Sequence, residues 1–202
     1  MDFLLPHTEP EKHSIWDEYV PTIQSGRHVD SYLTDSIEAP AEYNALCHAL
    51  RKAERYDTFT LHINNGGGYV DSAFMLIDAI THTKAKVTAS LTGTIASAAT
   101  LITLACDSII VAEHISWLTH NYSSGIQGKG GEMKAQMDFM SKELETSFRS
   151  IHEGFLTEEE CAKVIDDGDF WFNKSEVLAR WASRAANDSE GLAEIAATRK
   201  AK

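Results

Sequence analysis

The sequence has few cysteines, few prolines and no long apolar run. Its 202 residues include three cysteines, Cys47, Cys106 and Cys161, and no two of them form a C-x-x-C pair. Neither a disulfide framework nor a zinc site is therefore predicted, and a reducing, cytoplasmic environment is expected. No window approaches the roughly 18 apolar residues of a membrane-spanning helix, and no basic stretch followed by an apolar run marks the N-terminus as an export signal.

Positive charge is scarce as well. Eighteen lysines and arginines stand against 30 aspartates and glutamates, which gives a formal net charge of -12. Nucleic acid and anionic membrane surfaces repel such a chain at long range, so we expect neither as a partner. Apolar residues make up 43% of the sequence, enough for one domain with a substantial core.

Short apolar strands alternate with amphipathic helices in the first two thirds of the chain. Repeated strand, glycine turn and helix predict parallel crossovers and hence an α/β fold. In such folds the turns at the carboxyl ends of strands carry the functional site. The expected strands are His28–Ile37, Phe59–Ile63, Val87–Leu91, Ser108–Ala112 and Ser116–His120, and the expected helices are Ala41–Arg55, Val70–Ile80 and one that opens at Ser97.

The remainder of the chain predicts a long helix and short capped ones. Asn121–Gly131 is polar and glycine-rich, as in an extended excursion or a hairpin arm, and apolar residues then step by four and three over Met133–Phe155. That apolar stripe indicates a core or subunit interface. Capping pairs open two short helices. The pairs are Thr157 with Glu160 and Asn173 with Glu176. We predict an N-terminal arm over residues 1–27, a domain over 28–182 and a C-terminal appendage over 183–202.

Three side chains match the requirements of serine hydrolysis. That chemistry needs a nucleophile, an imidazole base, a carboxylate that orients the base, and N–H donors for the oxyanion. Ser97 opens a helix after a glycine turn, His120 ends a strand, and Asp169 precedes aromatic residues that could bury it. Taken singly, each has an ordinary reading as a packing, surface or capping residue. His114 is a nearby competitor for the base, and Asp166 and Asp167 compete for the carboxylate.

Four blocks in this order and spacing resemble the signature blocks of the Clp protease proteolytic subunit, ClpP. They are INNGGGYV (63–70), GTIASAAT (93–100), THNYSSGIQGKGGEM (119–133) and GDFWFNKSEV (168–177). The resemblance covers about residues 28 to 180. It implies a crotonase-like α/β spiral with a protruding strand–helix handle over about 121–156. It also implies a homo-oligomer of heptameric rings paired through their handles, with an AAA+ unfoldase as a possible partner.

The resemblance also assigns roles to residues. Ser97 is the nucleophile, His120 the general base and Asp169 its orienting partner, and the oxyanion donors are the backbone N–H groups of Gly67 and Ala98. No cofactor or metal is implied. The expected protein is thus a serine endopeptidase that cleaves peptides or unfolded protein inside a ring-shaped chamber.

Several positions depart from the family pattern. Gly66 stands where the family normally has proline, Ala98 where methionine is common, and Asn121 and Tyr122 where Gln-Pro follows the histidine. The glycine loosens a turn beside the expected oxyanion hole. These departures indicate a divergent member, and a phage-encoded one is an open possibility.

Three alternatives remain open at this point. The first is a catalytically silent ClpP-like structural or regulatory subunit, whose catalytic residues are held out of line. The second is a crotonase-like acyl-CoA enzyme, since that fold also builds an oxyanion hole from two N–H groups. The third is a serine peptidase in which Lys129 or Lys142 replaces His120 as the base.

Overall fold

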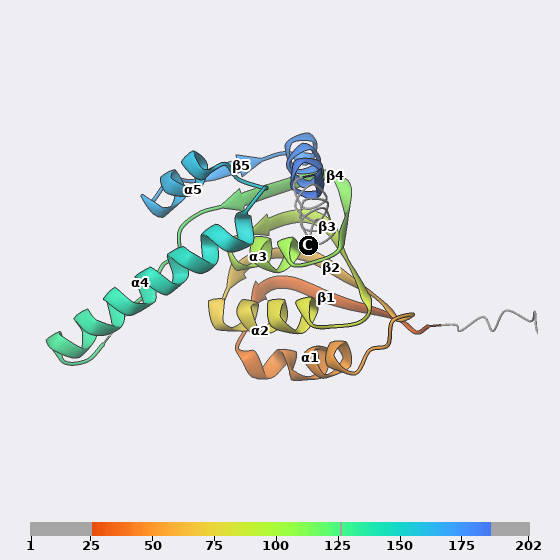
Figure 1. Cartoon of the computed structure of the whole chain (residues 1–202), viewed down its shortest axis with the longest axis horizontal. Helices are drawn as coiled ribbons and strands as arrows, with labels where there is room; N and C mark the ends of the chain where they lie inside the picture. Colours follow the sequence, from red (N-terminus) through yellow and green to blue (C-terminus); the bar gives the residue numbers. More distant parts are fainter. Residues whose placement is uncertain (1–25, 126, 187–202) are drawn as a thin grey trace, which may run out of the picture.

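The computed structural model describes residues 26–125 and 127–186, and its centre is a five-stranded sheet in the order β1-β2-β3-β4-β5. The strands are β1 (His28–Ile37), β2 (Thr58–Gly68), β3 (Lys86–Ala96), β4 (Ser108–Thr119) and β5 (Phe170–Phe172). The first four are parallel and β5 pairs antiparallel with β4. The α/β class expected from the sequence is confirmed (Figure 1).

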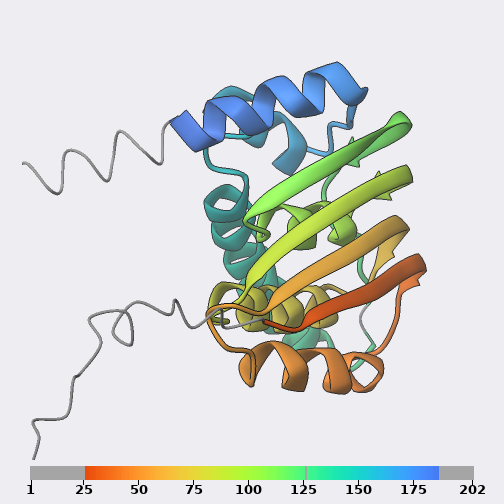
Figure 2. The same ribbon diagram turned by 90° about the vertical axis from the view of Figure 1, so that its right-hand side faces the viewer.

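Helices cover one face of the sheet and leave the other face open (Figure 2). The connecting elements are a 3-10 turn η1 (Pro40–Tyr43) and the helices α1 (Asn44–Arg51), α2 (Val70–Thr81) and α3 (Ala98–Leu104). Strand residues alternate between the two faces. In β2, for example, Phe59, Leu61 and Ile63 are buried, whereas His62 points outward and stacks on the exposed ring of Tyr32 at 4.6 Å. The core therefore lies between the sheet and α1 to α3.

The pairing register shifts once in each pair of neighbouring parallel strands, and the sheet bends there. The candidate site lies beyond this bend. The irregularities fall between Asp35 and Ile37, between Ile63 and Asn65, and between Leu91 and Gly93. We expected β2 and β3 to end before their glycines, and this is wrong. Both strands continue past the bend, because glycine tolerates the positive φ found there.

Other boundaries also differ from expectation. The two strands expected over Ser108–Ala112 and Ser116–His120 form the single strand β4, because the bend in the middle keeps pairing with β3 on both sides. The helix expected to reach Arg55 ends at Arg51. The three residues of β5 were not expected as a strand.

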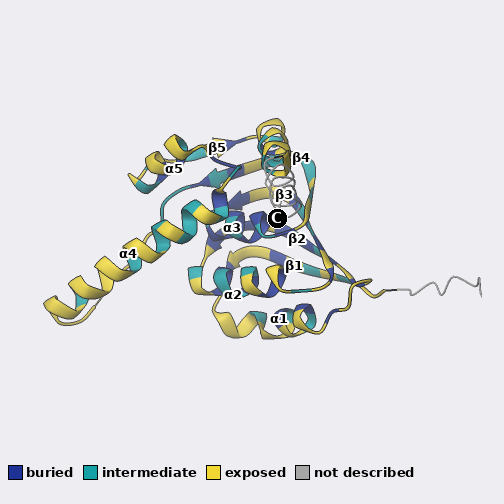
Figure 3. Ribbon diagram, viewed as in Figure 1, coloured by how far each residue is buried: buried dark blue, intermediate teal, exposed yellow. Residues whose placement is uncertain are grey.

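A long helix, α4 (Gly130–His152), projects from the body (Figure 1). It is the helical part of the predicted handle, and residues 121–125 and 127–129 before it contain no strand. Most of its length is exposed (Figure 3). Within the described residues no helix is both long and apolar enough to cross a membrane.

The predicted capping pairs are confirmed. In α5 (Glu158–Ile165), Thr157 and Glu160 form a complete capping box, and Asn173 and Glu176 exchange the same two bonds at the start of the helix over 174–186. Arg180 donates to both Glu160 carboxylate oxygens at 2.7 and 2.8 Å. This bond is the main reason that the pKa of Glu160 falls to about 2. The pairing fixes the final helix onto α5.

Residues 1–25 and 187–202, most of the predicted arm and appendage, lie outside the described residues.

Candidate active site

Ser97 lies at a sharp turn between β3 and α3. Its backbone angles are φ 55° and ψ -127°, an uncommon conformation for a residue with a side chain. Its N–H donates to Leu118 O on β4 at 3.0 Å, and its carbonyl accepts from the N–H and the hydroxyl of Thr100 at 2.9 and 2.7 Å. The Ser97 hydroxyl makes no capping bond. The turn thus holds the residue firmly while its hydroxyl plays no structural role in α3.

Each of the three predicted catalytic residues adjoins one end of a strand, and the three strands are neighbours in the sheet. Ser97 comes directly after β3 and His120 directly after β4. Asp169 comes directly before β5, whose Phe170 pairs with Thr119 in an antiparallel register. One further step of that register sets Asp169 opposite His120. The topology therefore brings the three backbones to one end of the sheet.

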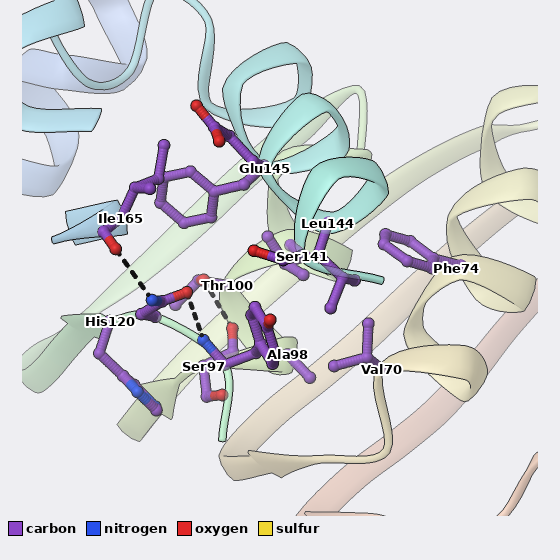
Figure 4. Close-up of a pocket in the computed structure, with 14 residues that line it drawn as sticks. Val70, Phe74, Ser97, Ala98, Thr100, His120, Ser141, Leu144, Glu145 and Ile165 are labelled. Atoms are coloured by element: carbon purple, nitrogen blue, oxygen red, sulfur yellow. Dashed lines mark hydrogen bonds between the residues drawn. The ribbon is translucent and has the colours of Figure 1, made fainter. Parts of the chain in front are cut away.

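Ser97 and His120 line the same cavity, which has a volume of about 100 Å³. Ala98 and Thr100 of α3 line it as well. Apolar side chains from α2, α3, α4 and the end of α5 form most of the remaining wall. They are Val70, Phe74, Leu101, Leu144, Phe148 and Ile165. In Figure 4 the side chains of Val70, Phe74 and Leu144 gather on the helical side of the cavity. The glycine turns, the chain after β4 and the Asp169 loop were expected at the site. The contribution of α4 was not, because it depends on a long-range contact and has no local sequence signal.

The three residues lie at the same end of the sheet, but no hydrogen bond joins their side chains in the part of the chain that the structure describes. Asp169 is exposed and does not line the cavity, so the expectation that the following aromatic residues bury it is wrong. The aromatic side chains of β5 point to the two faces of the strand instead of covering the residue before it. His114 lines a separate groove beside Lys174. Neither Lys129 nor Lys142 lines the cavity.

The expected oxyanion donors lie against the serine. A Cβ placed on Gly67 would be 2.5 Å from Ser97 Cβ and 3.1 Å from Ala98 N, so only glycine allows this approach. Ala98 is the first residue of α3, where an amide has no partner within the helix. The Gly67 N–H already donates to Asn65 Oδ1 at 2.8 Å. It would have to give up that bond to bind an oxyanion.

Asn121, noted in the sequence only as a departure from the family pattern, connects two segments of the site. Its Nδ2 donates to Ile165 O at 3.1 Å and to Asp167 Oδ1 at 2.9 Å, and its Oδ1 accepts from Tyr122 N. It thereby ties the chain after His120 to the loop that leads to β5. No local sequence signal announces this contact, because it joins residues more than 40 positions apart.

Two buried titratable groups, His152 and Cys106, lie outside the cavity lining. His152 of α4 is fully buried and stacks at 4.0 Å on Phe148, a cavity residue. Burial lowers the pKa of His152 to about 4, although its Nδ1 bond to Phe148 O acts in the opposite direction. Burial raises the pKa of the Cys106 thiol to about 12. Within 26–125 and 127–186, no group of three or more histidine, cysteine, aspartate or glutamate side chains could hold a metal ion.

Comparisons with known proteins identify the family and a similar fold. The sequence profile of the Clp protease family matches residues 22–179, so the chain belongs to that family. Among curated proteins, the ATP-dependent Clp protease proteolytic subunit 2 of Pseudomonas aeruginosa is 29% identical over 124 residues. That alignment covers 60% of this chain and 62% of the relative's length. The fold resembles a ClpP1 mutant from Listeria monocytogenes with a TM-score of 0.61 at 22% identity, covering 75% of this chain and 86% of that one.

Proposed function

We propose that this protein is a ClpP-like serine endopeptidase that uses Ser97, His120 and Asp169. One observation carries the proposal. The serine sits in a strained turn, its hydroxyl makes no hydrogen bond to the rest of the described chain, and it shares a cavity with His120. A serine needed only for capping or packing would have no reason to adopt this conformation. Membership of the Clp protease family supports the same reading.

In the proposed mechanism Ser97 Oγ attacks the carbonyl carbon of a peptide bond while His120 takes the hydroxyl proton. The N–H groups of Ala98 and Gly67 would stabilise the resulting oxyanion, the latter after releasing Asn65. His120 then gives its proton to the departing amine, and the C–N bond breaks. Water then attacks the carbonyl carbon of the acyl group while His120 takes a proton from the water. His120 returns that proton to Ser97 Oγ as the bond between Ser97 and the acyl group breaks. Asp169 would orient the His120 ring, because the two residues face each other one step beyond the last pair of β4 and β5.

The cavity suggests which substrates are accepted. Its apolar wall suits one aliphatic or aromatic side chain next to the bond that is cleaved. The carboxylate of Glu145, which lines the cavity, is already paired with Arg149 at 3.0 Å and leaves little free charge for a basic side chain. We therefore propose peptides or unfolded protein with an apolar residue at this position as substrates.

We also propose that the protein works as a homo-oligomer, a heptameric ring or double ring, that encloses the site in a chamber. The exposed apolar side chains on α4 support an assembly through the projecting helix. The Pseudomonas relative is described as part of an ATP-dependent protease, and an AAA+ unfoldase is accordingly a proposed partner.

The decisive experiment is intact mass measurement after incubation with a fluorophosphonate probe. The wild-type protein should gain one adduct, and Ser97→Ala should gain none and lose peptide cleavage by several orders of magnitude. Ser116→Ala, at an exposed serine of β4 that does not line the cavity, is the matched control and should still be labelled. Peptide cleavage that survives Ser97→Ala would overturn the assignment.

Two features favour one alternative, a catalytically silent subunit. Asp169 is exposed, and the Gly67 amide is bonded to Asn65. A folded, assembled protein that gains no adduct at Ser97, alone or with its substrate peptide, would establish this second function and exclude the first.

A further inference from the structure

Asn65 is a buried polar residue beneath the candidate site. It is 1% exposed and lies on β2 just past the bend, where it pairs with Asp35 on one side and Ile95 on the other. Its Oδ1 accepts the Gly67 N–H at 2.8 Å. Its Nδ2 has no hydrogen-bond partner in the part of the chain that the structure describes. The amide cannot be turned around, because an N–H group facing the Gly67 N–H would repel it.

A buried amide with one unsatisfied end lowers stability, since both ends were hydrogen-bonded to water in the unfolded chain. A leucine of nearly the same shape would avoid that cost in an apolar core. Such a locally unfavourable residue next to a functional site indicates that its acceptor atom has a task there.

The role of the Asn65 acceptor is indicated by the contacts of Gly67. The Gly67 backbone lies so close to Ser97 Cβ and Ala98 N that no side chain fits between them. Gly67 and Gly68 both have positive φ, 94° and 150°. Three consecutive glycines can adopt many conformations, so nothing in their own chemistry selects this one. Pairing of Gly68 with Ile37 of β1 holds the far end of the segment, and the side-chain bond from Asn65 restrains Gly67.

The position of Gly66 offers no steric reason for a glycine. A Cβ at Gly66 would meet only Asp35 O, at 3.7 Å, which is an ordinary contact. Its φ is not positive. The position thus has room for a stiffer residue, yet glycine is present. Gly66 therefore adds no stiffness of its own to the end of β2, and the Asn65 side chain restrains Gly67 directly.

We propose that Asn65 is a positioning residue of the resting site. Its bond to Gly67 holds the end of β2 against the Ser97–Ala98 turn, so that the Gly67 N–H already lies beside the nucleophile when it exchanges Asn65 Oδ1 for the oxyanion. The effect on catalysis rests on the proposed function. The structural part, the restraint of Gly67 at the end of β2 by a side-chain acceptor, can be measured without any activity.

The test compares three variants of the full-length protein. Asn65→Leu keeps the size and shape of the side chain but cannot accept a bond. Asn65→Ser keeps an acceptor that reaches the N–H two residues ahead. Asn64→Leu is the matched control, because Asn64 Oδ1 also accepts a backbone N–H, that of Thr94 at 3.0 Å, away from Gly67.

Asn65→Leu should keep or raise the melting temperature and yet lower kcat and the fluorophosphonate labelling rate by about tenfold or more, with KM almost unchanged, because the reacting groups are misplaced rather than unbound. Asn65→Ser should recover most of the rate. Hydrogen–deuterium exchange in the peptide over residues 63–70 should accelerate in Asn65→Leu and not in Asn65→Ser.

Wild-type or faster rates in Asn65→Leu, as expected if the bond only withholds the Gly67 N–H from the oxyanion, would overturn the proposal. An equal loss in Asn64→Leu would overturn it as well. If the wild-type protein is not labelled at all, the proposed function fails, and the exchange measurement alone decides the role of Asn65. Unchanged exchange in Asn65→Leu would then refute it.

Discussion

At the scale of single residues, His152 makes the base of α4 sensitive to acid. It is fully buried and its Nε2 has no hydrogen-bond partner among the described residues. Burial, aided by the nearby Arg184 guanidinium, lowers its pKa from 6.5 to about 4. Between these two values the unfolded chain binds a proton that the folded chain does not. Stability is therefore full above pH 6.5, falls as the pH drops through this window, and levels off below about 4.

We expect the free energy of unfolding to decrease by about 1 kcal/mol from this group between pH 7.5 and pH 5.5. Urea unfolding at fixed protein concentration measures it. His152→Phe removes the titrating group and should flatten this part of the pH dependence. His48→Gln, at an exposed histidine of α1, should keep the wild-type slope. An identical slope in His152→Phe and the wild type would show that another group is responsible.

At the scale of elements, the loop from α5 to β5 carries Asp166, Asp167 and Asp169, and their roles differ. Asp167 has a φ of 63° and its carboxylate accepts from Asn121. Asp169 lies one register step beyond the last pair of β4 and β5, opposite His120. The loop thus uses Asp167 to dock on the chain after β4, whereas the Asp169 side chain is exposed and makes no hydrogen bond within residues 26–125 and 127–186.

We expect Asp169→Asn to lower kcat for peptide cleavage by several orders of magnitude, since an amide no longer stabilises the required tautomer of His120. Asp167→Asn still offers an oxygen to Asn121 and should retain most activity. Steady-state kinetics of both variants, with circular dichroism to verify folding, test this. Comparable losses in the two variants would mean that the loop as a whole, and not one carboxylate, supports catalysis.

The same elements show what the sequence can predict. His28–Ile37 alternates with period two and forms β1 with those bounds, and the Thr157 and Asn173 caps begin helices where expected. These features depend on residues close in the chain. The extent of β2 and β3 depends instead on a shared bend, and β5 exists only because β4 is beside it. Neither has a local signal.

The candidate site divides in the same way. The turn at Ser97 and the strand end at His120 are local features. The first was expected from a glycine and small residues, and the second from a strand pattern that ends where the chain becomes polar. The cavity wall from α4, the bond between Asn121 and Asp167 and the one between Asn65 and Gly67 are not. The first two join distant segments, and the third requires knowing which way a buried amide points.

At the scale of the whole molecule, α4 would link the proposed assembly to the site. Its inner end supplies Leu144 and Phe148 to the cavity, and its outer part projects away from the body. Met133, Met137 and Met140 continue the same face of the helix outward. Met137 is 45% exposed in the single chain. A second copy that covers this face would therefore also fix the helix that walls the cavity.

We expect Met137→Glu to weaken the assembly, because a carboxylate in an apolar interface loses its hydration without gaining a partner. Ala135→Glu introduces the same charge on the opposite face of α4 and serves as the control. Light scattering after gel filtration should give the wild-type mass for Ala135→Glu and a smaller species for Met137→Glu. Peptide cleavage should fall with the mass, since the cavity wall then loses its support. Dissociation of both variants, or of neither, would exclude this face of α4 as the contact between copies.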